Sequence, residues 1–238
     1  MNIAIIPARS GSKGIANKNL MRLGDHSLLE RAVISAKKSG IFDCIVVSTD
    51  SLEYFNSVAD MGIVDIGLRP GHLSGDKAIA VDVACYTLNC LDIKPQSDAN
   101  LFWLQPTSPF RYASHIVEAI NHFANKNADS LVSVTKIPHN YVPNSIYKKA
   151  DDDTLDRVVI DTSEVYLRQK KEVFWARNGA AIYITKVKDL ISQKSFLNGK
   201  LVGYEMDSFT SIDIDEMEDF ELAKIVQPYH DRKYFDLA

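Results

Sequence analysis

Basic residues gather at the start of this chain, and acidic residues gather near its end. Residues 1–24 contain four basic residues and no acidic one, whereas residues 201–223 contain eight Asp and Glu and no Lys or Arg. The four basic residues are Arg9, Lys13, Lys18 and Arg22. Cationic side chains bind phosphate groups, and carboxylate oxygens are ligands that Mg²⁺ prefers. The two clusters together predict a site for a phosphate-bearing ligand and a metal ion.

The basic cluster follows a predicted buried strand. The apolar run of residues 2–8 breaks into a Gly/Ser loop over residues 7–14, and Lys18 and Asn19 come soon after. Backbone N–H groups of such a loop, with cations beside them, suit a polyphosphate. The spacing is not that of a P-loop, which would place Lys where Ile15 stands, nor that of a dinucleotide-binding loop. A surface turn with solvated lysines is the alternative, but four cations without a carboxylate, in a chain of net charge −4, favour phosphate.

The acidic cluster contains Ser-Ile-Asp-Ile-Asp-Glu over residues 211–216. In a strand, residues two apart point to the same face, so Asp213 and Asp215 are expected to project together. Two parallel carboxylates fit Mg²⁺, which is usually held by one or two carboxylates and substrate phosphates. A competing and compatible interpretation is that Asp215 caps a helix over residues 216–227, with Glu218 at the reciprocal capping-box position.

Short apolar runs alternate along the chain with segments of helical period. Strands are predicted at residues 2–8, 44–48, 63–66, 101–104 and 130–135, and helices at residues 28–39, 52–60, 77–91, 113–124 and 216–227. Continuous apolar strands between helices indicate a parallel sheet covered on both faces. The predicted fold is therefore a three-layer, mostly parallel, Rossmann-like α/β sheet, with ligands beyond the carboxyl ends of its strands.

Polar loops follow three of the predicted strands, so their side chains are expected to converge in one crevice. They cover residues 9–19, 48–50 and 105–111. Asp50 is more readily explained as the cap of the following helix than as a ligand contact. Gln105 and Arg111 fit a ligand role and a structural role equally well.

Composition limits the classes of protein. The 238 residues are 46% hydrophobic and suit one domain, and a pI of about 5.9 leaves no extended basic face for a nucleic acid. Three cysteines without CxxC spacing indicate free thiols in a reducing compartment. No signal segment and no window approaching about 18 apolar residues is found, which predicts a cytoplasmic protein without a membrane partner.

The segment from residue 136 to residue 172 does not continue the alternation of strands and helices. It combines prolines and charged residues with scattered aromatic and aliphatic ones. A disordered excursion is one explanation, but this apolar content favours an arm that packs on another subunit. We therefore predict a single domain over residues 1–238 with residues 136–172 as an inserted dimerisation arm.

Six motifs occur in order along the chain. They are Pro-Ala-Arg9 through Ser12-Lys13-Gly14 to Lys18-Asn19, Val-Ser-Thr-Asp50, Leu-Arg69-Pro, Gln105-Pro-Thr-Ser-Pro-Phe-Arg111, Asn178-Gly179-Ala-Ala-Ile-Tyr183 and Ile-Asp213-Ile-Asp215. In this combination the chain resembles the acylneuraminate cytidylyltransferases, the CMP-sialic acid synthetase family. The resemblance implies a homodimeric enzyme that transfers CMP from CTP to the anomeric hydroxyl of a nine-carbon keto-acid sugar. It also implies release of pyrophosphate and a need for Mg²⁺, which Mn²⁺ could replace.

The resemblance also implies a role for each matching residue. Triphosphate contacts fall on Arg9, Ser12, Lys13 and Lys18, and ribose and cytosine contacts on Asn19 and Arg69. Sugar contacts fall on Gln105, Asn178, Gly179 and Arg168, the last reaching the sugar carboxylate across the dimer. Asp213 and Asp215 would hold Mg²⁺, and Arg9, Lys18 and Asp213 form the catalytic group. In an in-line displacement at the α-phosphorus, such residues position the hydroxyl and neutralise charge.

Three departures from the family concern the substrate. Ala80 stands where many relatives have serine, residues 141–143 lack a lysine that some members use for the sugar, and Arg177 creates Ala-Arg-Asn-Gly. The acceptor is therefore open between N-acetylneuraminic acid and a relative such as legionaminic or pseudaminic acid. Alternative functions are a nucleotidyltransferase for 3-deoxy-octulosonate or a sugar phosphate, and a non-catalytic nucleotide-binding module.

Overall fold

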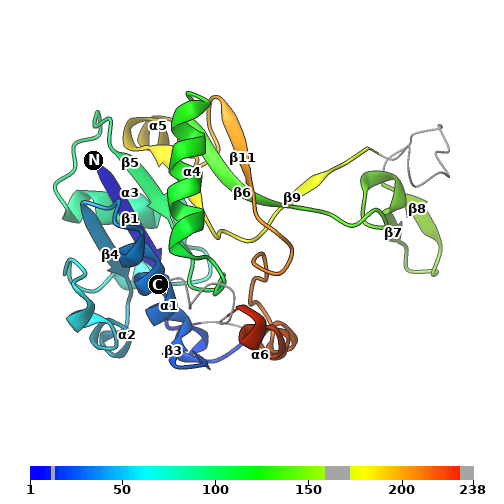
Figure 1. Ribbon diagram of the computed structural model, residues 1–238, viewed down its shortest axis with the longest axis horizontal. Coiled ribbons are helices and arrows are strands. Elements are labelled where there is room, and N and C mark those ends of the chain that lie inside the picture. The colour runs from blue at the N-terminus through cyan, green and yellow to red at the C-terminus, as the bar shows by residue number, and fades with distance from the viewer. Residues whose placement is uncertain (12–13, 159–171, 231–238) are drawn as a thin grey trace.

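The computed structural model describes residues 1–11, 14–158 and 172–230, and its centre is a mixed seven-stranded sheet (Figure 1). The strand order is β11-β6-β10-β5-β1-β4, with β9 added to β6. The strands are β1 (Asn2–Pro7), β4 (Cys44–Ser48), β5 (Asn100–Trp103), β6 (Ser130–Lys136), β9 (Trp175–Arg177), β10 (Tyr183–Lys186) and β11 (Leu201–Glu205). Only β9 and β10 run antiparallel to their neighbours in this sheet, so the prediction of a mostly parallel sheet is confirmed.

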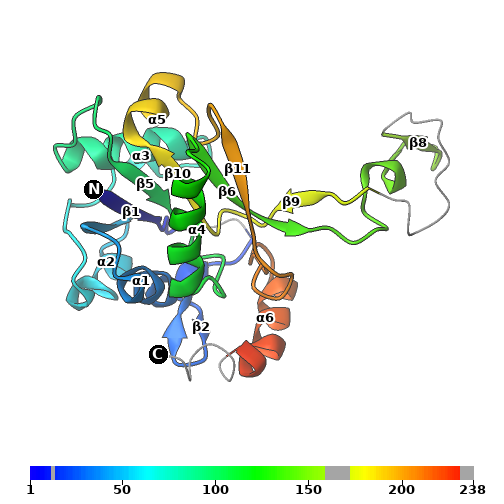
Figure 2. The same ribbon diagram turned by 45° about the horizontal axis from the view of Figure 1, so that its top comes forward.

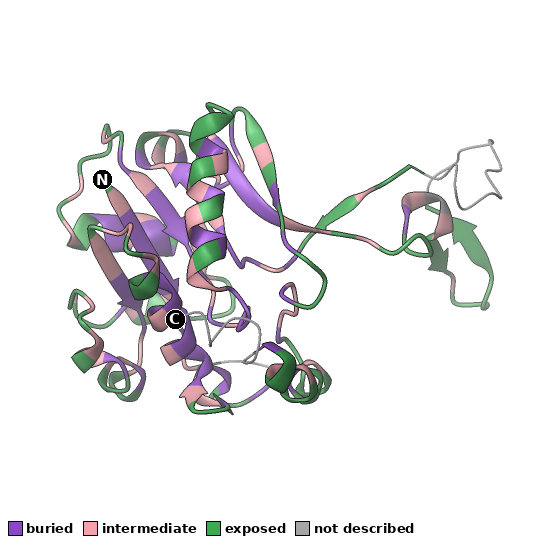
Figure 3. Cartoon of the chain, in the orientation of Figure 1, coloured by how far each residue is buried: buried purple, intermediate pink, exposed green. Residues whose placement is uncertain are grey.

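Helices cover both faces of the sheet, as Figure 2 shows. They are α1 (Leu28–Ser39), α2 (Leu52–Asn56), α3 (Ala80–Cys90), α4 (Ala113–Asn125), α5 (Val187–Gln193) and α6 (Met217–His230). Alternate residues of β1 point to opposite faces: Ala4 and Ile6 pack with α1 and α4, while Ile3 and Ile5 pack with α3 and α5. The three-layer arrangement is therefore confirmed, and the strands β1, β5 and β10 at the centre of its sheet are largely buried (Figure 3).

Helix α1 begins and ends where local chemistry predicts. Ser27 and Glu30 form a reciprocal capping box at its start, and Gly40 ends it in a left-handed conformation with φ of 66°. Between β1 and α1 lie the short 3₁₀ turn η1 (Lys18–Leu20) and the hairpin of β2 (Arg22–Leu23) and β3 (His26–Ser27). The Gly/Ser loop is thus followed at once by a tightly folded segment.

Two predictions of secondary structure near β4 are wrong. Residues 63–66 form no strand: Val64 N donates to Ile45 O at 2.8 Å, but no ladder of hydrogen bonds with β4 follows in this part of the described chain. The helix after β4 is also shorter than predicted: α2 stops at Asn56, and the 3₁₀ turn η2 (Ala59–Met61) follows it.

The segment from residue 212 to residue 216 is an irregular loop and not a strand. Ile214 is nevertheless fully buried, because Ile214 N donates to Thr107 O at 2.8 Å and holds the loop against the sheet. Asp219, the third residue of α6, takes the reciprocal capping-box position predicted for Glu218, because its Oδ2 accepts hydrogen bonds from Asp215 N and Glu216 N, each at 2.9 Å. Glu216 and not Asp215 stands directly before the helix, and the Asp215 side chain lies 3.3 Å from Lys18 Nζ instead. Helix α6 also runs past Pro228 to His230.

An arm projects from the sheet between β6 and β9 (Figure 1). It carries the 3₁₀ turn η4 (Pro143–Ser145) and the hairpin of β7 (Tyr147–Lys149) and β8 (Leu155–Arg157), while η3 (Gly71–Leu73) lies in the main body. The exposed large apolar side chains of this region are Tyr141, Ile146, Tyr147, Leu155, Val158, Val173 and Trp175. The structure thus has the arm, and its role in dimerisation stays a prediction.

In the three described ranges, none of the helices has both the length and the apolar character that crossing a bilayer requires.

Candidate nucleotide site

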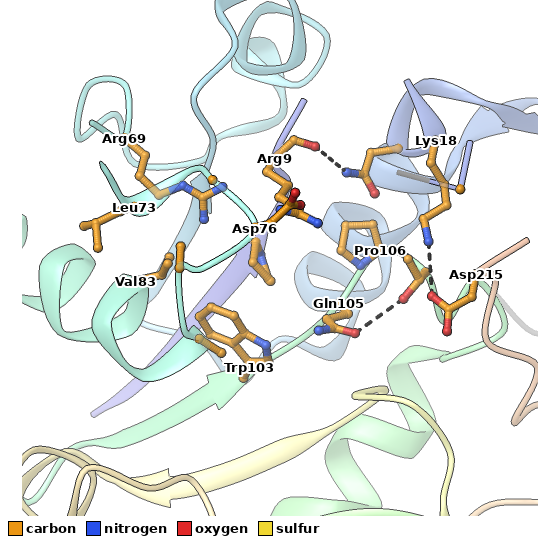
Figure 4. Close-up of a pocket in the computed structure, with 17 residues that line it drawn as sticks. Arg9, Lys18, Arg69, Leu73, Asp76, Val83, Trp103, Gln105, Pro106 and Asp215 are labelled. Carbon is orange, nitrogen blue, oxygen red and sulfur yellow. Dashed lines mark hydrogen bonds and ion pairs between the residues drawn. The ribbon is translucent and has the colours of Figure 1, made fainter. Parts of the chain in front are cut away.

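A cavity of about 410 Å³ opens at the carboxyl ends of β1 and β5 (Figure 4). Its lining contains six of the residues singled out from the sequence, namely Arg9, Lys18, Asn19, Arg69, Gln105 and Asp215. In Figure 4, Arg69 lies at one end beside Leu73 and Val83, and Lys18 with Asp215 lies at the other. Residues more than 200 positions apart in the sequence therefore meet in one cavity.

Asp50 organises the loop after β1 and does not cap α2. Its carboxylate accepts hydrogen bonds from Ser10 N at 2.8 Å and from Ser10 Oγ at 3.0 Å. Ser51 is the cap of α2, because its hydroxyl oxygen accepts from Tyr54 N. The expectation that Asp50 caps the helix is therefore wrong, and the side chain ties two loops together at the sheet edge.

Lys18 joins the basic start of the chain to the acidic loop. The residue is only 9% exposed. Its Nζ donates to Ile214 O at 2.6 Å and lies 3.3 Å from Asp215 Oδ1. The loop before Lys18 can lie close to the acidic segment because residue 14 is glycine: a Cβ at Gly14 would lie 2.6 Å from Asp215 O. Asn19 stands beside Lys18 and donates from Nδ2 to Arg9 O at 3.3 Å, so the loop, the lysine and the acidic segment form one assembly.

Arg69 and Arg9 occupy the other end of the cavity. Arg69 is 6% exposed, its backbone N donates to Thr49 O at 2.7 Å, and its Nε has no hydrogen-bond partner among the described residues. Burial lowers the pKa of Arg69, the Asp50 charge opposes that shift and the Arg9 charge adds to it. Arg9 forms an ion pair with Asp76 at 3.0 Å. Two cationic residues thus line a space that suits an anion-bearing ligand.

Asp213 lies against Gly179. Gly179 has φ of +73°, and a Cβ at that position would overlap the Asp213 carboxylate. Ser108 Oγ donates to Asp213 Oδ1 at 3.3 Å. Burial raises the pKa of Asp213, and the Asp215 charge adds to that rise, while hydrogen bonds from Thr107 and Ser108 and the Lys18 charge oppose it. The motifs around Gly179 and Asp213 are therefore parts of one site.

Gln105 stands between this cavity and a second one of about 510 Å³, because it lines both. Its backbone is held on both sides: Gln105 N donates to Ala180 O at 3.1 Å, and Arg111 Nη1 donates to Gln105 O at 2.8 Å. Arg111 also donates to Ala181 O at 3.0 Å, and its complete burial lowers its pKa to about 9. Arg111 is therefore a structural residue that fixes Gln105.

Asn178 also has a structural role, because it joins β9 to the segment of residues 206–211. It is buried, and its Nδ2 contacts Ser211 Oγ at 3.0 Å and Met206 Sδ at 3.4 Å. It lines neither of the two cavities, whereas its neighbour Gly179 lines the second. Ser12, Lys13 and Arg168 lie outside the described residues, so their predicted contacts stay predictions.

Two lining residues have no signal in the sequence. Asp76 follows a glycine in an irregular loop, and a lone acidic residue there suggests no pairing with Arg9. Trp103 ends β5 and fits a core position by its apolar pattern, yet its side chain also lines the cavity. Both become part of the site only when distant loops close around the sheet edge.

The fold and the site together indicate the class of protein. Helices on both faces of a mostly parallel sheet, with a cationic cavity at the carboxyl ends of the strands, form a nucleotidyltransferase fold. A solved CMP:2-keto-3-deoxy-manno-octonic acid synthetase in complex with CTP has the same fold, with a TM-score of 0.70, 14% identity and coverage of 96% of this chain and 98% of that one. The model of the cytidylyltransferase family matches residues 3–231, and the chain belongs to that family.

Two relatives in sequence agree with this assignment. The N-acylneuraminate cytidylyltransferase of Escherichia coli is 37% identical over 238 residues, which cover 99% of this chain and 54% of the relative. The CMP-N,N'-diacetyllegionaminic acid synthase of Legionella pneumophila is 30% identical over 93% of this chain and 94% of the relative. The chain spans about half the length of the first relative and nearly all of the second. The resemblance found from the six motifs is confirmed at the level of the family.

Proposed function

We propose that this chain transfers CMP from CTP to the anomeric hydroxyl of a nonulosonic acid, forming a CMP-sugar and pyrophosphate. One observation carries the proposal: a single cavity in a cytidylyltransferase fold gathers Arg9, Lys18 and Arg69 with Asp215 and Gln105. The cations suit the triphosphate, and the amide of Gln105 stands where an acceptor in the second cavity would meet it. The relatives named above act on acceptors of this chemical class.

Lys18 and Arg9 would hold the triphosphate. In an in-line displacement the attacking hydroxyl and the leaving pyrophosphate stand on opposite sides of the α-phosphorus, and the protein mainly positions them and neutralises charge. Lys18 Nζ is held by its hydrogen bond to Ile214 O, which would orient the ammonium group toward the triphosphate. Arg69, which lines the same cavity, would contact the ribose and cytosine.

Asp213 and Asp215 would hold Mg²⁺, or Mn²⁺ in its place. Both offer hard oxygen donors, and a bound cation would offset the burial and the Asp215 charge, which raise the pKa of Asp213. Within the described ranges no three His, Cys, Asp or Glu residues are grouped to hold a metal, so phosphate oxygens are expected to complete the coordination. The ion would neutralise negative charge that develops on the phosphates.

We also propose a homodimer in which the arm reaches the partner subunit. The exposed apolar side chains of the arm have no cover within the described residues of one chain, which is consistent with an interface. Light scattering of the full chain checks this, with a dimer expected.

The experiment that tests the reaction is pyrophosphate release from CTP and Mg²⁺. It is run without an acceptor and then with N-acetylneuraminic, legionaminic, pseudaminic and 3-deoxy-octulosonic acids in parallel. Release with one of the nine-carbon acids is the expected result and identifies the sugar. Release with 3-deoxy-octulosonic acid alone would move the proposal to the eight-carbon acceptor, and CTP binding without any release would favour a non-catalytic module.

A further inference from the structure

The second cavity has a single basic residue in its lining. Its residues are Gln105, Ala176, Arg177, Gly179, Ala180 and Tyr183. Arg177 is the one charged residue in this lining, and no Asp or Glu of the described ranges forms an ion pair with it. A cavity with a single cation, an amide and a phenol suits a ligand that carries one anionic group and several hydroxyl groups.

Arg177 is held in position from both sides of the chain. It ends β9 and pairs with Val134 of β6, and the next residue, Asn178, is tied to Ser211 by a hydrogen bond of 3.0 Å. Its Nη1 lies 3.5 Å from the Tyr183 hydroxyl oxygen, and the Tyr183 hydroxyl donates to Gly179 O at 3.2 Å. The pairing with β6 and the contact with Tyr183 therefore hold the Arg177 guanidinium beside a second residue of the cavity lining.

The acceptor's chemistry explains what such a cation would bind, and this step rests on the proposed function. In a 2-keto-acid sugar the carboxylate is bonded to the anomeric carbon, next to the hydroxyl that attacks CTP. The carboxylate must therefore lie close to the boundary with the nucleotide cavity, which Gln105 marks. The Asp213 carboxylate lies on the other side of Gly179. An acceptor carboxylate so near Asp213 and a triphosphate needs a positive partner to offset the repulsion.

We infer that Arg177 binds the carboxylate of the acceptor sugar, in addition to the contact that the resemblance implies for Arg168 of the partner subunit, and that Tyr183 positions the Arg177 guanidinium. Arg is suited to this task because its planar group donates two parallel hydrogen bonds to a carboxylate. Arg177 supplies this cation from β9, an exposed strand of the same chain at the base of the arm. Arg177 is therefore a determinant of acceptor specificity, separate from the cations that bind CTP.

The test compares Arg177→Gln and Arg177→Lys with the unaltered protein, using the acceptor that the pyrophosphate assay identifies and the methyl ester of its carboxylate. Arg177→Gln is expected to raise KM for the free acid about tenfold or more, the effect of losing a charge-assisted pair, with KM for CTP within about twofold. Arg177→Lys should lie between the two. The ester should lose most of its dependence on Arg177. Lys224→Gln, which removes one exposed charge on α6, is the matched control.

Each outcome has a definite meaning. An unchanged KM for the acid, or equal losses for the acid and the ester, would overturn the role of Arg177. If the unaltered protein turns over none of the acids, the proposed reaction fails, and calorimetry of each free acid with the unaltered and Arg177→Gln proteins in the presence of CTP then tests the binding role alone. Thermal melting of both variants excludes misfolding as the cause, and Arg177→Lys keeps the test open if Arg177→Gln does not fold.

Discussion

The two ends of the nucleotide cavity are built differently. At one end Lys18 is buried and its ammonium group is bonded to a backbone carbonyl, whereas at the other Arg9 has a side chain 37% exposed and is paired with Asp76, itself 49% exposed. Both lysine and arginine come from the same basic cluster in the sequence. The difference teaches that a lysine held by a backbone carbonyl can meet phosphate and keep that contact, whereas Arg9 would exchange its carboxylate partner for phosphate.

The largest expected effect concerns the carboxylates at the Lys18 end. Asp213→Asn should lower turnover by about a thousandfold or more while CTP still binds, because a metal worth several kcal/mol acts mainly on the transition state. Pyrophosphate release and CTP calorimetry measure the two effects separately. Full activity in this variant would remove Asp213 from the metal site.

The next effect tests whether Lys18 is set in place as a binding group. Lys18→Ala should weaken CTP affinity and rate together, by about tenfold to a hundredfold in kcat/KM, since a charged hydrogen bond contributes about 1.5–3 kcal/mol. Steady-state kinetics give the ratio, and Lys224→Gln is the control for loss of one positive charge. Kinetics equal to those of the control would mean that Lys18 does not bind CTP and is only a structural residue.

Gly179 tests how tightly the carboxylate end is packed. Gly179→Ala should cost about 1–3 kcal/mol of stability, because the residue has a left-handed φ and its new Cβ would overlap Asp213. Displacement of Asp213 should also reduce turnover several-fold. Denaturant titration and pyrophosphate release measure these changes. Gly71→Ala is the matched control, as a Cβ there meets no atom within 4 Å, and equal behaviour of the two variants would contradict the close packing.

The smallest expected effect has the opposite sign and lies at the Arg9 end. Asp76→Asn should tighten CTP binding by about twofold to fivefold, since phosphate no longer competes with Asp76 for Arg9, and the gain should shrink as salt rises. CTP titrations at low and high salt check this. Asp98→Asn removes a comparable exposed pair, with Lys188, away from the cavity. Weaker CTP binding in Asp76→Asn would mean that Asp76 contacts the nucleotide itself.

Local chemistry explains which predictions hold. The capping box of Ser27 and Glu30 and the alternating burial along β1 depend on neighbours a few residues apart, so the sequence displays them directly. The predicted caps Asp50 and Asp215 are wrong for a different reason. Ser51 caps α2 in place of Asp50, and α6 begins two residues after Asp215. Each aspartate instead meets a partner far along the chain, Ser10 or Lys18.

The sequence by itself determined the alternation of strands and helices, the basic and acidic clusters and the family, because periodicity, charge and ordered motifs are properties of the chain. Only the tertiary structure decided that Gly179 lies against Asp213, that Arg9 pairs with Asp76 and that Gln105 separates two cavities. Gly179 and Asp213 are 34 positions apart in the sequence, and Arg9 and Asp76 are 67 positions apart. These contacts arise because the strands of one sheet bring the loops at their carboxyl ends together, whatever their separation in the chain.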